Sequence, residues 1–288
     1  MNTLNKTYKE LAIPYFKEVF DCIDETMSIH DIPYYLIGVN AIALALLKNE
    51  IKPARGTKDI DFAVMISSIK EYDKICKTLV EKGFNKVSAP WTFYSEKYKA
   101  VVDILPFGEI EEEDTVNFNN RRIDLHVLGF KEVLSDSVPV NIEEKVVNIP
   151  PLPGMVLLKL IAWSDRPEER ADDISDILRI IEHYFDIAYD EILDSHYDTF
   201  PEEGELDTFA VAAEVLGRKS GIFLTKSKEL SKRISELIKL NTKSPSESSI
   251  AKRWAQVKGW DVEYAFSILK AFEKGLLKFL HNQKQIDI

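Results

Sequence analysis

Two apolar segments that carry aspartates constrain the fold of this chain more than any other feature. Residues 59–66 (DIDFAVMI) and residues 100–105 (AVVDIL) have the aliphatic, β-branched character of buried strands. Asp59 and Asp61 are two positions apart, so a strand would place both carboxylates on one face, ~6.6 Å apart along the chain. The residues between and after them would then point the other way, into a core.

Asp103 interrupts the second segment, where an aspartate among aliphatic residues needs a partner. Taken singly, each feature has an ordinary explanation: an exposed acidic strand edge for Asp59 and Asp61, and a paired buried carboxylate for Asp103. Three carboxylates from two strands are what a two-metal phosphoryl-transfer site needs. The pattern therefore predicts Mg²⁺ (or Mn²⁺) at Asp59, Asp61 and Asp103, with a nucleoside triphosphate (NTP) as substrate.

A glycine ends the short strand predicted over residues 33–38, directly before an Ala/Leu-rich helix predicted over residues 40–48. Such a junction presents free backbone N–H groups and the positive end of a helix to an anion, although a plain strand-to-helix turn would also use Gly38. Arg55 and Lys58 lie in the loop before the first aspartates. They could balance the charge of a triphosphate, or be solvated.

The character of the chain changes at residues 150–153 (PPLP), after which helical periodicity replaces strand patterns. We expect an α+β fold with a mixed-sheet domain over residues 1–150 and a helical domain over residues 151–288. Pro106 is expected to end the strand that carries Asp103. The helices of the second domain are expected over residues 155–163, 173–184, 208–216, 226–240 and 261–280.

Lys159 lies in an apolar segment of the first of these helices. A lysine is seldom fully buried without a partner, so it either extends to solvent or meets an anion. The anion would be a triphosphate or an aspartate from residues 172–176. Asp173 and Asp176 share one helical face, although an aspartate near a helix start is also a common cap.

The charge distribution is uneven although the net charge is −11. Residues 151–216 contain 4 basic and 17 acidic side chains, whereas residues 217–260 contain 11 basic and 3 acidic ones. Trp254 and Trp260 lie in the basic segment, and basic groups with aromatics can bind single-stranded nucleic acid. A solvated helix face with core tryptophans explains the pattern equally well.

Other features exclude several classes of protein. The two cysteines and five scattered histidines give neither a disulfide framework nor a zinc motif. No apolar stretch approaches the ~20 residues that span a bilayer, and the amino terminus lacks the pattern of a signal peptide. We therefore expect a cytoplasmic protein without a membrane partner.

Two groups of motifs resemble those of a known family. Gly38-Val-Asn-Ala41, followed by Arg55-Gly-Thr-Lys-Asp-Ile-Asp-Phe62, resembles the opening of the AbiEii/AbiGii-type nucleotidyltransferase toxins. Residues 158–163 (LKLIAW), Arg166 and residues 173–177 (DISDI) resemble their second signature. The resemblance covers roughly residues 30–185. It implies a DNA polymerase β-like nucleotidyltransferase core, with a mixed sheet and flanking helices, followed by a helical domain.

The resemblance also implies roles for individual residues. Asp59 and Asp61 would bind metal, with Asp103 as a third carboxylate, and Gly38 would face the phosphates. Lys159 would match the basic signature residue, and Asp173 or Asp176 its acidic companion. Val39 departs from the family, which often has a second small residue there, and it offers only its backbone amide to a phosphate.

The function that we expect is metal-dependent transfer of a nucleotidyl group from an NTP to an acceptor. In related toxins the acceptor is tRNA and a cognate antitoxin protein is encoded beside the toxin, so both are expected partners. The basic segment favours RNA, whereas the net negative charge leaves open a small-molecule acceptor, as in antibiotic-modifying nucleotidyltransferases. A third alternative is a binding module that keeps this fold without catalysis.

Overall fold

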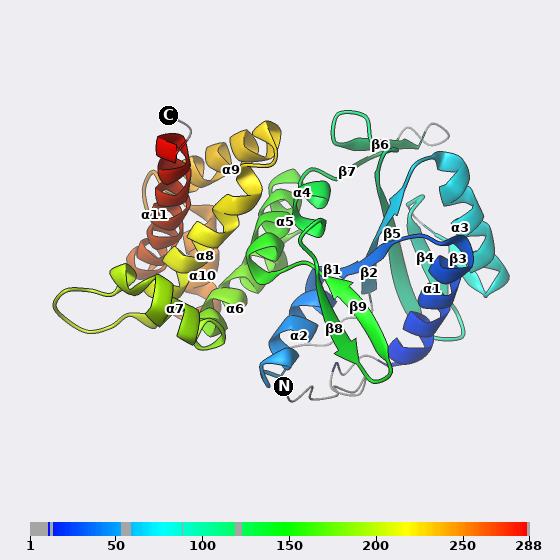
Figure 1. The fold of residues 1–288 in the computed structure, drawn as a ribbon, viewed down its shortest axis with the longest axis horizontal. Helices are drawn as coiled ribbons and strands as arrows, with labels where there is room; N and C mark the ends of the chain where they lie inside the picture. Colours follow the sequence, from blue (N-terminus) through cyan, green and yellow to red (C-terminus); the bar gives the residue numbers. More distant parts are fainter. Residues whose placement is uncertain (1–10, 12–13, 53–58, 88, 119–122, 287–288) are drawn as a thin grey trace. The chain divides into compact units, whose positions relative to one another are not determined.

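The computed structural model describes residues 11, 14–52, 59–87, 89–118 and 123–286 (Figure 1). The chain divides into two compact units, Met1–Pro151 and Leu152–Ile288. The first contains all the strands and the second is entirely helical. Within the described ranges, no helix is both long and apolar enough to cross a membrane. The α+β class predicted from the sequence is confirmed.

A five-stranded sheet with the strand order β1-β2-β5-β4-β3 organises the first unit. β2 and β5 are parallel, and the other neighbouring pairs are antiparallel, so the sheet is mixed as expected. Its strands are β1 (Tyr34–Ile37), β2 (Asp59–Ile66), β3 (Phe84–Lys86), β4 (Thr92–Ser95) and β5 (Ala100–Gly108).

One face of this sheet packs against two helices, α1 (Phe16–His30) and α3 (Ile69–Glu81), which lie beside it in Figure 1. The rings of Phe20 and Phe62 lie 6.2 Å apart, and the Tyr72 hydroxyl donates to the Ile104 carbonyl at 2.9 Å. The alternation of β2 explains this core, because its even-numbered residues are all buried and point to this face.

The prediction that Pro106 ends its strand is wrong, since β5 continues to Gly108. The Ile104 amide donates to the Trp91 carbonyl, on the side of β4. The nitrogen of Pro106, two residues after Ile104, points to the same side, but the pairing of β5 with β4 has already ended at Asp103. Proline is tolerated in a strand where no neighbouring strand needs its missing N–H.

An apolar cluster covers part of the opposite face of the sheet. It contains Ile37, Ala63 and Phe107 from the sheet, packed against Val116, Val127 and Leu134. The covering elements are the hairpin of β6 (Thr115–Phe118) and β7 (Ile123–His126) and the short helix α4 (Phe130–Leu134). A second hairpin, β8 (Val138–Ile142) and β9 (Lys145–Ile149), and helix α2 (Gly38–Lys48) complete the unit.

The second unit is built around the pair α8 (Thr208–Leu224) and α11 (Val262–Ile286), which contact each other extensively. The helix expected to end at Leu216 continues because Gly217 lies directly against the backbone of α11. A Cβ at Gly217 would be 2.2 Å from the Phe272 carbonyl oxygen, and one at Gly275 would be 1.9 Å from the Glu214 carbonyl oxygen. The remaining helices are α5 (Leu152–Asp165), α6 (Ala171–Ile187), α7 (Tyr189–Ser195), η2 (Tyr197–Thr199), α9 (Lys228–Asn241) and α10 (Ser249–Lys258).

We expect Gly275→Ala to destabilise the protein by about 1–3 kcal/mol or more, because the added methyl forces α8 and α11 apart. Leu277→Ala, on an exposed position of the same helix, should change stability by no more than about 0.5 kcal/mol. Urea denaturation measures both. Equal stability of the Gly275→Ala variant and the wild type would show that the helices do not approach as closely as described.

Candidate active site

The parallel pairing of β2 with β5 brings two of the predicted carboxylates together. Asp61 and Asp103 are direct register partners. Neighbouring strands lie about 4.8 Å apart and partners point to the same face, so the two side chains emerge next to each other. Asp59 shares this face two residues earlier, opposite Val101.

This part of the sheet face is partly exposed to solvent. Asp59 is exposed, and Asp61 and Asp103 are partly exposed, whereas the residues between them are buried on the helix-covered side. The apolar cluster covers only the half of the face toward the carboxyl ends of β2 and β5. The carboxylates therefore occupy the half that a substrate could reach.

Gly38 lies directly against one of these carboxylates. It has φ +68°, and a Cβ placed on it would be 2.3 Å from Asp61 Oδ2. The preceding residue, Ile37, is the register partner of Asp61 on β1, which explains the close approach. α2 begins at Gly38, and within the described residues no side chain caps this helix start. The positive end of α2 is thus next to Asp61, with the amide of Val39 in the first turn.

Asn40 is a residue of this site that sequence reasoning missed. Its side chain is 2% exposed, and Nδ2 donates to the Asp59 carbonyl at 2.9 Å. This bond holds the first turn of α2 against the start of β2. An asparagine at the start of an otherwise Ala/Leu-rich helix was the available signal, because a buried amide needs partners.

Strand β4 adds two more residues that were missed. Thr92 pairs with Asp103 and Tyr94 pairs with Val101, so both point to the face that carries the carboxylates. Both are partly exposed, whereas Phe93 and Ser95 on the other face are buried. The alternation of burial along this four-residue strand matches the period of two, but the sequence analysis predicted no strand there.

Two of the predicted nucleotide-binding residues, Arg55 and Lys58, lie outside the described residues. In the described part of the chain, no group of three or more His, Cys, Asp and Glu side chains is placed to hold a metal ion. The assignment of metal to Asp59, Asp61 and Asp103 stays a prediction.

The second unit contains the other group of predicted site residues. Lys159 Nζ donates to Asp173 Oδ1 at 2.6 Å and to Asp176 Oδ2 at 2.8 Å, and all three side chains are largely buried. Of the alternatives for Lys159, which were solvent, a triphosphate and an aspartate of residues 172–176, the structure shows the contact with the aspartates. Burial alone would lower the pKa of Lys159, but the nearby charges of Asp176 and Asp173 outweigh it and raise the pKa above its ordinary value.

This cluster links α5 to α6 as a charged pair of carboxylates around one ammonium. Asp173 also lies 3.5 Å from Arg170 Nη1, in the turn before α6. The cap position of α6 is Arg170, so neither aspartate is its N-cap. Lys159 and the two aspartates thus stabilise one another's charges inside the helical unit. Removing one of these three side chains would leave a buried charge without its partner.

Several cations of the basic segment 217–260 are paired with carboxylates of the acidic segment 151–216. The pairs are Arg218 with Asp198 and Glu214, Lys219 with Glu191, Arg233 with Asp165, Arg253 with Asp172, and Lys258 with Glu182. Trp254 is buried, and its Nε1 donates to the Ile174 carbonyl. Trp260 packs edge-to-face against Phe209 and Tyr264. Much of the charge asymmetry is therefore complementarity within the helical unit.

Comparisons with known proteins give weak similarities. No protein-family model and no curated protein matches the chain. A solved structure of an antigenic nucleotidyltransferase-like protein from Paracoccidioides brasiliensis has 15% identity and a TM-score of 0.39, and covers 79% of this chain and 93% of its own.

Two further solved structures also show low sequence identity and low TM-scores. The antibiotic-resistance factor ANT(2'')-Ia has 10% identity and a TM-score of 0.32, covering 63% of this chain and 96% of its own. The cyclic dinucleotide synthase CdnE of Elizabethkingia meningoseptica, solved with GTP and Apcpp, has 8% identity and a TM-score of 0.29, covering 93% of each chain. These TM-scores are too low to carry an argument about this chain, so the AbiEii/AbiGii resemblance stays a prediction.

We expect Lys159→Met to lower the free energy of unfolding by about 3–5 kcal/mol, because Asp173 and Asp176 would stay buried without the ammonium that they share. The triple variant Lys159→Met/Asp173→Asn/Asp176→Asn should recover most of that loss. Lys228→Met, at an exposed position on α9, should be nearly neutral. Chemical denaturation measures the series, and a loss in Lys159→Met as small as that in Lys228→Met would contradict the buried triad.

Proposed function

We propose that this protein is a metal-dependent nucleotidyltransferase that moves a nucleotidyl group from an NTP to an acceptor. The observation that carries the proposal is the pairing of Asp61 with Asp103 on adjacent strands, with Gly38 against Asp61 at the start of α2. One side of the site offers carboxylate oxygens and the other offers backbone amides at a helix start. Metal-bound triphosphates need this combination.

The residues fit a hard divalent cation. Asp61 and Asp103 supply oxygen ligands from neighbouring strands, and Asp59 lies on the same face. Gly38 leaves room beside Asp61 that any Cβ would fill. When bound, Mg²⁺ or Mn²⁺ neutralises triphosphate charge and favours in-line attack of an acceptor hydroxyl on the α-phosphorus.

The other residues of the site would bind the phosphates or hold α2 in position. The backbone N–H groups of Gly38 and Val39 would donate to phosphate oxygens at the start of α2, and Arg55 and Lys58 would offset triphosphate charge. Asn40 positions the first turn of α2 through the carbonyl of Asp59.

The resemblance assigns Lys159, Asp173 and Asp176 to catalysis. Their mutual contacts support a role in which they fix α5 and α6 relative to each other. Each carboxylate contacts the single ammonium, and Arg170 beside Asp173 supplies a second positive charge.

The sheet order suggests where the acceptor binds. Gly38 and β1 flank β2 on one side, which is the triphosphate side, and β4 flanks β5 on the other. An acceptor that approaches Asp103 from β4 would meet Thr92 and Tyr94. The tyrosine ring offers a surface for an unpaired base.

We propose RNA, and tRNA in particular, as the acceptor, with the protein acting as the toxin of a toxin–antitoxin pair. The resemblance and the position of Tyr94 support this assignment. The pairing of Arg218, Lys219, Arg233, Arg253 and Lys258 within the helical unit, five of the eleven cations of the basic segment, weakens the support that this segment had given to RNA. That observation favours a small-molecule acceptor as the second candidate.

Retention of the fold as a non-catalytic binding module is disfavoured by the same geometry. Two carboxylates at paired register positions repel each other when both are charged, and they contribute no apolar packing. A cation that lies between them would remove this cost.

Mg²⁺ or Mn²⁺ should raise the apparent melting temperature by roughly 5–10 °C at a hundredfold excess over the dissociation constant, because the cation binds only the folded state. Asp61→Asn should abolish both this shift and nucleotidyl transfer, while leaving the apo protein at least as stable as the wild type. Asp73→Asn, at an exposed position on α3, should keep the shift. If Asp61→Asn unfolds the apo protein, Asp61 is structural and the site assignment is wrong.

Tyr94→Ala should weaken RNA labelling by about 1–3 kcal/mol, expressed mainly in KM for RNA, because a base loses its stacking surface. Tyr94→Phe should retain it. Transfer of radiolabelled nucleotide to total RNA measures the effect, and affinity for the NTP should be unchanged in both variants. Wild-type labelling by Tyr94→Ala would exclude the β4 side as the acceptor site, whereas label that appears only on a small molecule would establish the second candidate.

A further inference from the structure

Four aromatic side chains of the helical unit form one continuous cluster at its surface. The ring of Phe185 lies 5.9 Å from that of Tyr189 and 6.3 Å from that of Phe200, and Phe200 stacks on Tyr197 at 4.9 Å. Tyr197 is 68% exposed and Tyr189 is 47% exposed. Nearby in the sequence, Leu193 is exposed as well.

Carboxylates alone accompany these aromatic groups in the sequence. Between Arg179 and Arg218 the chain contains 11 Asp and Glu residues and no lysine or arginine. We name the four aromatic residues, with six exposed carboxylates of the same segment that are not Glu191 or Asp198, the aromatic–acidic surface. Its carboxylates are Asp186, Asp190, Asp194, Glu202, Glu203 and Glu205, and all six are exposed.

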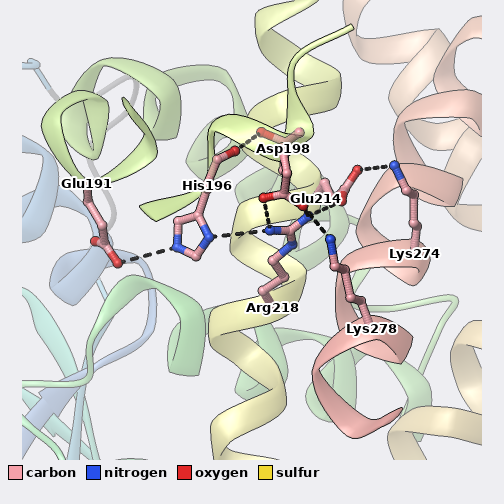
Figure 2. Close-up of polar contacts among 8 residues, drawn as sticks. Glu191, His196, Asp198, Glu214, Arg218, Lys274 and Lys278 are labelled. Atoms are coloured by element: carbon pink, nitrogen blue, oxygen red, sulfur yellow. Dashed lines mark hydrogen bonds and ion pairs between the residues drawn. The ribbon is translucent and has the colours of Figure 1, made fainter. Parts of the chain in front are cut away.

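Polar contacts hold the segment that carries this surface to α8 and α11 (Figure 2). Arg218 on α8 donates to both carboxylate oxygens of Asp198, at 2.8 and 2.9 Å, and Lys278 on α11 pairs with the same carboxylate. His196 lies 3.7 Å from Glu191, which also binds Lys219.

The pKa values agree with this arrangement. Hydrogen bonding from Arg218 holds the pKa of Asp198 well below its usual range, and burial lowers the pKa of His196. Arg218, Lys219 and Lys278 are thus paired with Asp198 and Glu191. The six carboxylates of the aromatic–acidic surface remain exposed to solvent. A preorganised surface loses little entropy when a partner binds.

We propose that the aromatic–acidic surface docks an arginine-bearing segment of a partner protein. A guanidinium can stack on a tyrosine ring while its N–H groups bind a carboxylate in a fork, and exposed Tyr189 and Asp190 are consecutive residues of α7. A lysine ammonium matches such a site less well because it is a strongly hydrated point charge. This docking does not rest on nucleotidyl transfer.

The charge of this surface also favours an arginine-bearing protein over a nucleic acid or a second copy of the chain. A nucleic acid would be repelled, because its phosphates would face carboxylates without a cation between them. A second copy of the chain would offer mainly lysines, because the sequence contains 28 lysines and 9 arginines.

The test measures binding of two fluorescein-labelled peptides to the full chain by anisotropy at physiological salt. One peptide alternates arginine with alanine, and the other alternates lysine with alanine. The variants are Tyr189→Ala/Tyr197→Ala, which keeps the charge, and Asp190→Asn/Asp194→Asn, which keeps the packing. Tyr15→Ala, at a tyrosine that is 53% exposed in the first unit, is the matched control.

We expect the arginine peptide to bind more tightly than the lysine peptide. The double tyrosine variant should weaken arginine-peptide binding roughly 5- to 30-fold, from two exposed cation–π contacts, and Tyr15→Ala should not. The aspartate variant should weaken both peptides. All variants should transfer nucleotide, if the wild type does, at its rate.

Three results would overturn the proposal. Equal affinity for the two peptides, with no effect of the tyrosine variant, would mean unspecific attraction of polycations. Self-association of the wild type that the tyrosine variant abolishes would assign the surface to a second copy. Competition by single-stranded RNA that is lost in the tyrosine variant would assign it to nucleic acid.

Discussion

The in-register pairing of β2 with β5 is the constraint on which the site depends. It is the only arrangement of these two strands that sets Asp61 opposite Asp103, since a shift by one residue would turn one carboxylate into the core. Two full charges about 5 Å apart repel by roughly 3 kcal/mol at an effective dielectric constant of about 20. The buried residues on the other face of both strands fix the register against this repulsion, and the position of Gly38 follows from the pairing of Ile37 with Asp61.

The helical unit follows a different principle, in which opposite charges from two consecutive parts of the chain meet. The acidic segment, residues 151–216, forms α5 to α7 and most of α8. The basic segment, residues 217–260, forms the end of α8 together with α9 and α10. Their ion pairs lie at the contacts between helices, and close packing of α8 on α11 at Gly217 and Gly275 completes the core. The carboxylates left over on residues 186–205 define the surface that we assign to a partner.

The sequence predicted those parts of the structure that local patterns determine. The period of two in β2 gave its bounds and the shared face of Asp59 and Asp61, and the apolar surroundings of Lys159 indicated an anionic partner. Long-range packing determined the rest. The continuation of β5 through Pro106 depends on where β4 ends, and the continuation of α8 through Gly217 depends on a distant helix. Thr92 and Tyr94 join the site only through strand pairing that no local pattern displays.

The central claim is that Asp61 and Asp103 together bind a divalent cation beside Gly38. Anomalous diffraction from crystals of the protein soaked with Mn²⁺ and a non-hydrolysable NTP tests it most directly. We expect an anomalous peak within ligand distance of both carboxylates, with the triphosphate at the start of α2, and loss of that peak in Asp103→Asn crystals. A nucleotide and Mn²⁺ bound elsewhere, or a peak that persists at full height in Asp103→Asn, would contradict it.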